Sequence, residues 1–247
     1  MKAFLIAFLL LPFSFFGQPP FSDITLDAGI DNIYDVYQGL FGGGVVAFDY
    51  NNDGYEDLFI TGGQGQDVLY KNNGDATFKD ITKESGLFKD RMIVTTGVSS
   101  ADVNKDGFVD LFVTTIASQA DQSKKKKTLA PNLLYINNGD GTFTDFSSKY
   151  GIIKNNFSTS SSFGDINADG YPDLFVGNYF KNFYFEDSPF NTHNIALLNH
   201  YSINEEYETG DDQLFINVEG KYFKEVSDLL MDSGKGYGFG GVFTDFD

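Results

Sequence analysis

A nine-residue motif, Asp-x-Asn-x-Asp-Gly-x-x-Asp, occurs three times in the chain, at residues 49–57, 102–110 and 165–173. It places oxygen-bearing side chains at alternate positions around a glycine, a spacing that lets one loop surround a hard divalent cation. Each copy is followed at once by Leu, Phe and a β-branched residue, which is typical of a β-strand. The chain therefore predicts three equivalent cation sites, each fixed to the start of a strand.

Calcium is the cation that this set of ligands favours, since it takes six to eight oxygens at about 2.3–2.6 Å. Positions 1, 3, 5 and 9 offer side-chain oxygens, position 7 offers a backbone carbonyl, and the glycine at position 6 permits a left-handed turn. The motifs contain no His or Cys, which disfavours zinc and copper, and magnesium prefers fewer protein ligands. A fourth copy of the repeat reaches its motif at Asp245. The predicted ligands are Asp49, Asn51, Asp53, Tyr55, Asp57, Asp102, Asn104, Asp106, Phe108, Asp110, Asp165, Asn167, Asp169, Tyr171, Asp173, Asp245 and Asp247.

The spacing excludes an EF-hand, which needs a Glu at position 12 and flanking helices. Position 12 is Ile60, Val113 or Val176, inside the expected strand. The remaining alternative is a plain Asp-Gly turn with solvated carboxylates. Three copies in one register favour the metal site over the turn.

The elements that must position these loops recur with them. A hairpin pattern around an Asn-Gly or Glu-Gly turn follows each motif, at residues 69–82, 134–147 and 214–227. One unit thus contains four short strands: one before the motif, one after it and two in the hairpin. Such a unit is typical of a β-propeller blade, which must stack on its neighbours to bury its faces.

The predicted fold is all-β, an N-terminal fragment of a β-propeller with about three complete four-stranded blades in residues 18–247. The fourth copy, residues 240–247, predicts that the propeller is incomplete and continues beyond residue 247. Residues 21–30 repeat the sequence of a fourth strand, residues 78–87, without three strands of their own. We expect this orphan strand to close the last blade.

Two insertions interrupt the pattern. Residues 115–131 contain the run Lys124 to Lys127 and are predicted to form a solvated loop rather than a binding patch. Residues 178–212 are rich in aromatic and acidic residues, and they form either a functional loop or a decoration. The second insertion holds His193 and His200, and nothing in the sequence groups these histidines into a catalytic site.

The N-terminus and the charge bound the location and the partners. Residues 1–17 resemble a signal peptide, with Lys2, an apolar run too short to span a membrane, and Gly17 before the cut. The alternative is a buried N-terminal helix. The net charge of −18 argues against nucleic acid and anionic lipid as partners, and the absence of Cys excludes disulfides. We expect a secreted or cell-surface protein with no membrane span in this segment.

The motifs, the hairpins and the Phe-x-Asp-Ile-Thr signature of residues 21–25 and 78–82 resemble the FG-GAP/VCBS repeat family, which includes the integrin α-subunit propellers. The signature is similar to the cartilage-acidic-protein-like branch of exported bacterial proteins. The resemblance implies a propeller of seven or eight blades, with calcium between first and second strands. The family's Phe-Gly-Gly-Ala-Pro pattern is reduced here to Phe41-Gly42-Gly43-Gly44 and Phe239-Gly240-Gly241, which argues against an integrin-like ligand but not against the fold.

The leading hypothesis is a secreted, calcium-binding propeller that acts as a binding or adhesion module for an extracellular protein or glycan. Calcium then has a structural role in the loops between strands. The alternatives are a polysaccharide-active, lyase-like enzyme and a carbohydrate-binding lectin. We expect no enzymatic activity, because no residues group into a site for acid–base chemistry.

Overall fold

The computed structural model describes residues 21–35, 42–87, 92–121, 126–180, 209–230, 240–241 and 243. Within these residues the chain forms strands and turns and no α-helix, which confirms the predicted all-β class. The predicted signal peptide and the predicted ligands Asp245 and Asp247 lie outside the described residues.

Three antiparallel sheets, here called blades 1 to 3, follow one another along the chain. In each blade the strand before the motif pairs with the strand after it, and the hairpin then adds two more strands. Blade 1 contains β1 (Val45–Phe48), β2 (Asp57–Ile60), β3 (Val68–Asn72) and β4 (Phe78–Asp80). Blade 2 contains β5 (Met92–Ala101), β6 (Asp110–Asp121), β9 (Leu133–Asn137) and β10 (Phe143–Asp145), and blade 3 contains β11 (Asn155–Gly164), β12 (Asp173–Phe180), β13 (Gln213–Val218) and β14 (Tyr222–Glu225), followed by the 3-10 turn η2 (Ser227–Leu229).

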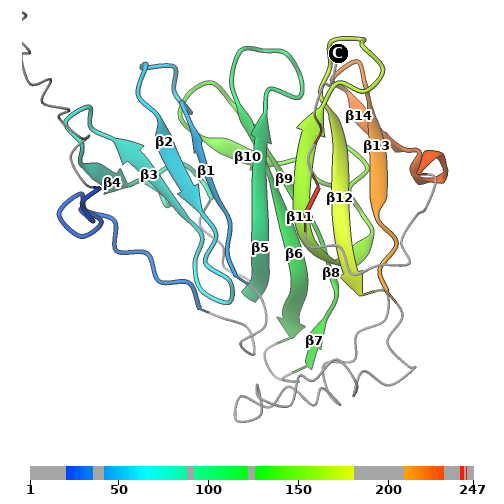
Figure 1. Cartoon of the computed structure of the whole chain (residues 1–247), viewed down its shortest axis with the longest axis horizontal. Helices are drawn as coiled ribbons and strands as arrows, with labels where there is room; N and C mark the ends of the chain where they lie inside the picture. The colour runs from blue at the N-terminus through cyan, green and yellow to red at the C-terminus, as the bar shows by residue number, and fades with distance from the viewer. Residues whose placement is uncertain are drawn as a thin grey trace, which may run out of the picture.

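The blades stand side by side with their first strands adjacent, so that β5 contacts both β1 and β11 (Figure 1). Small residues allow this close approach. A Cβ atom at Gly97 would lie 2.8 Å from the backbone oxygen of Thr159, and one at Gly44 would lie 2.8 Å from the backbone nitrogen of Val98. The arrangement is that of a partial β-propeller, as predicted.

The core lies between the blades because successive strand residues point to opposite faces of a sheet. Leu111 and Val113 of β6 pack toward blade 1, against residues such as Phe59. Phe112, between them in sequence, packs on the other face against blade 3, where Leu174 lies. Blade 2, which lies between the other two, is therefore apolar on both faces, which explains the continuous Leu-Phe-Val run after its motif.

The insertion at residues 115–131 is more ordered than the sequence indicates, and the prediction of a solvated loop is wrong for much of it. Strand β6 continues to Asp121 and pairs with β7 (Lys126–Thr128). The chain then crosses to blade 3, where β8 (Ala130–Pro131) pairs with β11. The segment thus ties the two blades together. Of the second insertion, only residues 178–180 and 209–212 are among the described residues.

The orphan segment at residues 21–30 docks through its second half. The backbone N–H of Phe78 in β4 donates to Ala28 O at 2.8 Å, as Phe143 N–H donates to Ser85 O in the next blade. The first half forms no strand, because no described strand pairs with it, and Phe21 is fully exposed at 106%. The turn therefore follows the repeat, while the expected closing strand is not formed among the described residues.

Gly241 and Phe243 lie against blade 3, where a Cβ atom on Gly241 would meet the Phe175 ring. The Phe243 ring meets Phe175 edge-on at 6.5 Å between centroids. Its backbone N–H donates to Ser162 Oγ at 3.4 Å. That a fourth copy of the repeat begins at residue 240 stays a prediction.

Candidate metal centre

The three motif loops lie at the same end of their blades, between the first and second strands (top of Figure 1). Each loop is tightened by two residues in the left-handed region. Position 4 has a φ of 58°, 60° or 57°, and the glycine at position 6 has a φ of 88°, 90° or 88°. A non-glycine residue rarely adopts such an angle, so its recurrence at Asn52, Lys105 and Ala168 shows that the three loops share one backbone shape.

The aspartate at position 1 closes each loop through both of its oxygens. In the first loop Asp49 Oδ1 accepts the N–H of Asp53 at 3.0 Å, and Oδ2 accepts the N–H of Gly54 at 2.7 Å. The same pair of bonds forms at Asp102 and at Asp165.

The side-chain oxygens of positions 3 and 5 also accept backbone N–H groups of the loop. Asn51 Oδ1 accepts the N–H of Asp53 at 3.2 Å, and Asp53 Oδ1 accepts the N–H of Tyr55 at 3.1 Å. The Asn51 amide also donates to Asp53 Oδ2 at 2.9 Å. Corresponding bonds recur in the second and third loops. Positions 1, 3 and 5 thus all bond to the backbone N–H groups of positions 5 to 7.

The aspartate at position 9 is buried, with exposed fractions of 0%, 1% and 0% for Asp57, Asp110 and Asp173. In the first loop Asp57 Oδ2 accepts the N–H of Tyr50 at 3.1 Å, and Oδ1 accepts the N–H of Asn72 at 2.7 Å. Position 9 therefore joins its loop to the third strand of the blade. The sequence predicts a ligand at this position but not this second role.

Burial is the main cause that raises the pKa of all three position-9 carboxyls, and for Asp110 it raises the pKa to about 7. The two backbone N–H donors oppose this shift. The carboxylates of positions 5 and 1 add to it, because like charges disfavour ionisation. Asp102, Asp106 and Asp110 thus lie within electrostatic range of one another, and a bound cation would relieve their repulsion.

The donor set fits calcium in chemistry: three carboxylates, one amide and one carbonyl per loop are all oxygen ligands. In the described part of the chain, no group of three acidic, His or Cys side chains is already arranged to hold a metal. In the first loop the oxygens of positions 1, 3 and 5 accept N–H groups of residues 53–55, while position 9 accepts those of position 2 and of the third strand. One cation already touches a predicted ligand, since Lys71 Nζ lies 3.2 Å from Asp53 Oδ2.

An aromatic residue at position 7 covers the glycine of the neighbouring hairpin, which sequence reasoning missed. A Cβ atom on Gly74 would lie 2.8 Å from the Tyr55 ring, and one on Gly139 would lie 2.7 Å from the Phe108 ring. Tyr171 stands in the same relation to Gly220, at 3.2 Å. The contact fixes the loop to the hairpin of its own blade, so the Asn-Gly turn serves the site as well as the strand reversal.

Replacing Gly139 with Ala is expected to destabilise the protein more than replacing Gly141. Both glycines have a positive φ, 75° and 88°, so each substitution carries the left-handed strain of about 1–2 kcal/mol. Only at Gly139 does the new methyl group also strike a ring, which adds about 1–3 kcal/mol. Unfolding in urea measures both losses, and equal losses would contradict the ring contact.

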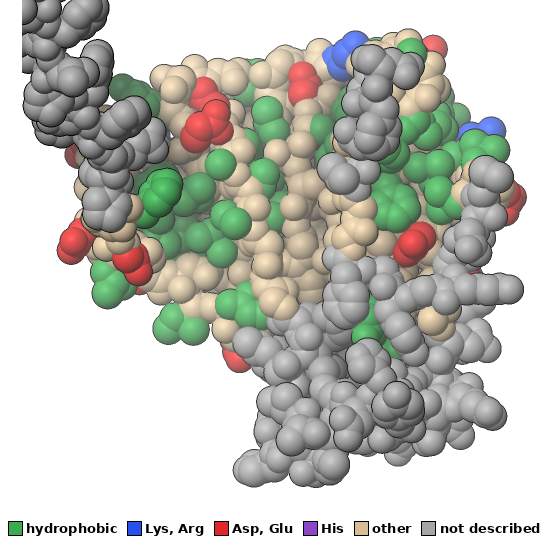
Figure 2. Space-filling model, viewed as in Figure 1, with side chains coloured by type: hydrophobic (Ala, Val, Ile, Leu, Met, Phe, Trp, Pro, Cys, Tyr) green, Lys and Arg blue, Asp and Glu red, His purple; other side chains and the backbone are tan. Residues whose placement is uncertain are grey.

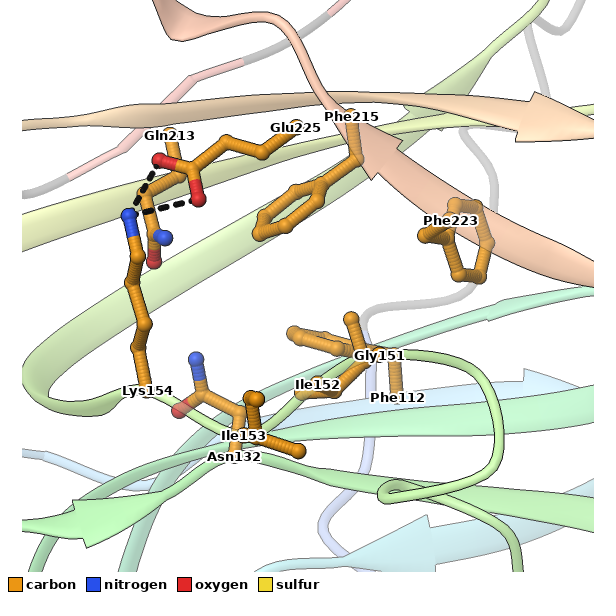
Figure 3. Close-up of a pocket in the computed structure, with 10 residues that line it drawn as sticks. All are labelled: Phe112, Asn132, Gly151, Ile152, Ile153, Lys154, Gln213, Phe215, Phe223 and Glu225. Atoms are coloured by element: carbon orange, nitrogen blue, oxygen red, sulfur yellow. Dashed lines mark hydrogen bonds and ion pairs between the residues drawn. The ribbon is translucent and has the colours of Figure 1, made fainter.

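A second candidate site, a cavity of about 180 Å³, lies between blades 2 and 3 (Figure 3). Phe112, Phe215 and Phe223 line its apolar side, and Lys154 pairs with Glu225 at 2.6 Å on the other. Burial opposes ionisation of Glu225, but hydrogen bonds from Lys154 and its neighbours hold the pKa of this carboxyl below its ordinary value. A general acid needs a raised pKa, so this cavity offers none at Glu225.

The surface charge agrees with an anionic protein. Among the described residues, Figure 2 shows acidic side chains spread over the face in view and basic side chains at its upper right. No helix in the described residues is long and apolar enough to cross a membrane.

Comparison with known families identifies a repeat family. The sequence model described as an FG-GAP-like repeat matches residues 49–113 and 116–176, just over half of the chain. The matched segments contain all three motif loops. A comparison with curated proteins finds no match.

Proposed function

Because the chain belongs to the FG-GAP-like repeat family, we propose that it is part of a calcium-stabilised β-propeller that acts outside the cell as a binding or adhesion module. One observation carries the calcium proposal. The same loop, in which the side-chain oxygens of positions 1, 3 and 5 accept the same backbone N–H groups, stands at the same end of three successive blades. A plain turn needs only the aspartate at position 1 and the glycine, and position 9 also joins the loop to the third strand, so it is the repetition of positions 3 and 5 that supports a metal role.

In this proposal the side-chain oxygens of positions 1, 3, 5 and 9 and the carbonyl of position 7 hold one calcium ion in each loop. Calcium supplies positive charge that offsets three carboxylates. The residues themselves fix the loop: Asp49 closes it, Asp53 accepts the N–H of Tyr55, and Asp57 connects the loop to β3. The role is structural, and it holds the end of one strand to the start of the next.

Calcium is expected to raise the melting temperature of the protein, and EDTA to remove that increase. Each site adds a free energy that grows with the calcium concentration, about 2.7 kcal/mol at one hundred times its Kd. The matched control replaces the exposed position-5 aspartates Asp53, Asp106 and Asp169 with Ala, which should abolish the calcium response. Melting curves that coincide in calcium and in EDTA would contradict the proposal.

Calcium affinity is expected to fall as the pH is lowered from about 7.5 to about 5.5, because the ligands bind metal only when ionised. The pKa of Asp110 is raised from 3.8 to about 7 in the metal-free fold. Its contribution to metal-free stability is therefore fully present below pH 3.8 and is lost as the pH rises through about 7, while calcium acts in the opposite direction. Calorimetric titrations at the two pH values, in buffers of different ionisation enthalpy, measure affinity and proton release. A pH-independent affinity would contradict this prediction.

Export and partner choice are separate parts of the proposal. The signal-like residues 1–17 and the net charge of −18 support a location outside the cell, where calcium is plentiful, and an extracellular protein or glycan as partner. Saturable binding on a glycan array would favour a lectin over a protein-binding module. We expect no activity on acidic polysaccharides, and turnover in such a screen would instead support the lyase-like alternative.

A further inference from the structure

Two buried asparagines connect blades 2 and 3 to the motif loop of the blade before each. Asn137 ends β9 and Asn217 lies near the end of β13, with exposed fractions of 1% and 0%. Asn137 Nδ2 donates to the backbone oxygen of Tyr50, in the first loop, at 2.8 Å. Asn217 Nδ2 donates to the backbone oxygen of Val103, in the second loop, also at 2.8 Å. Tyr50 and Val103 both occupy position 2 of their loops.

The same residues also hold the predicted ligands at position 9. The N–H of Tyr50 donates to Asp57 Oδ2 at 3.1 Å, on the other side of the residue whose carbonyl accepts from Asn137. The backbone N–H of Asn137 donates to Asp110 Oδ1 at 2.8 Å. Asp57 of the first loop is thereby connected to Asp110 of the second loop through Tyr50 and Asn137 alone.

The connection repeats at the next boundary between blades. The N–H of Val103 donates to Asp110 Oδ2 at 2.9 Å, and the N–H of Asn217 donates to Asp173 Oδ1 at 2.8 Å. One hydrogen-bonded chain therefore runs through the buried position-9 carboxylates of all three loops. We refer to it as the asparagine relay, and its members are Asp57, Tyr50, Asn137, Asp110, Val103, Asn217 and Asp173.

We propose that the asparagine relay couples neighbouring calcium sites, so that calcium in one loop raises the affinity of the next. The proposal rests on the calcium function proposed above. It assigns to Asn137 and Asn217 the role of positioning residues, because neither lies within a motif loop and each acts through the aspartate of its own blade.

The coupling follows from burial. The side chains of Tyr50 and Val103 are buried between blades, which restricts rotation of their backbone. Each residue therefore keeps its N–H bond to the aspartate and its carbonyl bond to the asparagine together. Calcium that orders Asp57 therefore also orders Tyr50, Asn137 and, through them, Asp110. The second calcium then meets a site whose ordering is already complete, which is positive cooperativity without a change of fold.

Asn72 supplies a matched control. It ends β3 of blade 1 in the same place, and its N–H donates to Asp57 Oδ1 at 2.7 Å. Its side chain accepts the N–H of Gly74, as Asn137 accepts that of Gly139. Its amide donates to Glu56 O within its own blade at 2.9 Å, as Asn137 donates to Val109 O at 3.3 Å, but among the described residues Asn72 makes no bond to another blade like the bond of Asn137 to Tyr50 O. Asn72→Ala thus removes the local bonds of this position and leaves the bridge between blades 1 and 2 intact.

The test measures calcium binding at the second loop with and without a functional first loop. The chain has no Trp, so Phe108→Trp places a single fluorescent reporter at position 7 of the second loop. Asp53→Ala silences the first loop. We expect this change to weaken calcium binding at the reporter about five-fold or more with Asn137 present, and less than about two-fold in Asn137→Ala. Asn72→Ala should keep the full effect.

The same experiment at the boundary between blades 2 and 3 keeps the proposal testable if a variant of the first boundary fails to fold. Tyr171→Trp reports on the third loop, Asp106→Ala silences the second, and Asn217→Ala interrupts the relay there. If the reporters detect no calcium in otherwise unchanged protein, the proposed function and the coupling are both overturned. If calcium binds but silencing one loop affects the next equally with and without its asparagine, or if Asn72→Ala acts like Asn137→Ala, the coupling alone is overturned.

Discussion

Replacing Asp110 with Ala is expected to destabilise the metal-free protein by about 2–5 kcal/mol. The carboxylate is buried and accepts the N–H groups of Val103 and Asn137 at 2.9 and 2.8 Å. Removing it leaves two buried donors without their acceptor, and each such group costs about 1–3 kcal/mol. Urea unfolding in EDTA measures the loss without any contribution from calcium.

Asp106→Ala is the matched control, because Asp106 lies in the same loop but is exposed. Its removal should change the metal-free stability by less than about 1 kcal/mol. In calcium, both variants should lose the stabilisation that their loop provides. Equal losses in EDTA would mean that position 9 has no structural role beyond that of a ligand.

Replacing Phe112 with Ala is expected to destabilise the protein by about 3–5 kcal/mol, whether or not calcium is present. The side chain is fully buried between blades 2 and 3, among Leu134, Leu174 and Val176. It also meets the ring of Phe163 edge-on at 6.2 Å between centroids. A cavity at this boundary removes contacts from two blades at once.

Phe21→Ala deletes the same atoms from an exposed side chain, so it should change stability by less than about 0.5 kcal/mol. Thermal and urea unfolding of the two variants give the comparison. Similar losses for Phe112→Ala and Phe21→Ala would contradict the packing between blades.

The blades themselves could be predicted from the sequence, because each blade repeats the same recognisable local signals. The Leu-Phe-Val run after the motif and the Asn-Gly turn each specify a local structure that tertiary packing does not override. Residues 115–131 show the opposite case. The Lys run from Lys124 to Lys127 indicates a solvated loop. Lys126, however, belongs to β7, which pairs with β6, and the β8 residues that follow pair with β11.

The site was predictable in its ligand types and only partly in its geometry. Asp57 and Asp110 read as ligands because of their spacing, but nothing local shows that they are buried or that they receive an N–H from the third strand. Asn137 was hidden for another reason. In the sequence it belongs to an Asn-Asn-Gly turn, which already explains an asparagine there, and its bond to Tyr50 spans most of two blades.

The hydrogen bonds between blades have a direction. Each amide of the asparagine relay reaches back to the blade that precedes it, so a motif loop receives its last donor only from residues that are synthesised later. Tyr50 and Val103, which accept these bonds, are buried beneath the blades that follow them. In both described boundaries the later blade therefore completes the loop of the blade before it, so a motif loop reaches its final structure only after the following unit has folded.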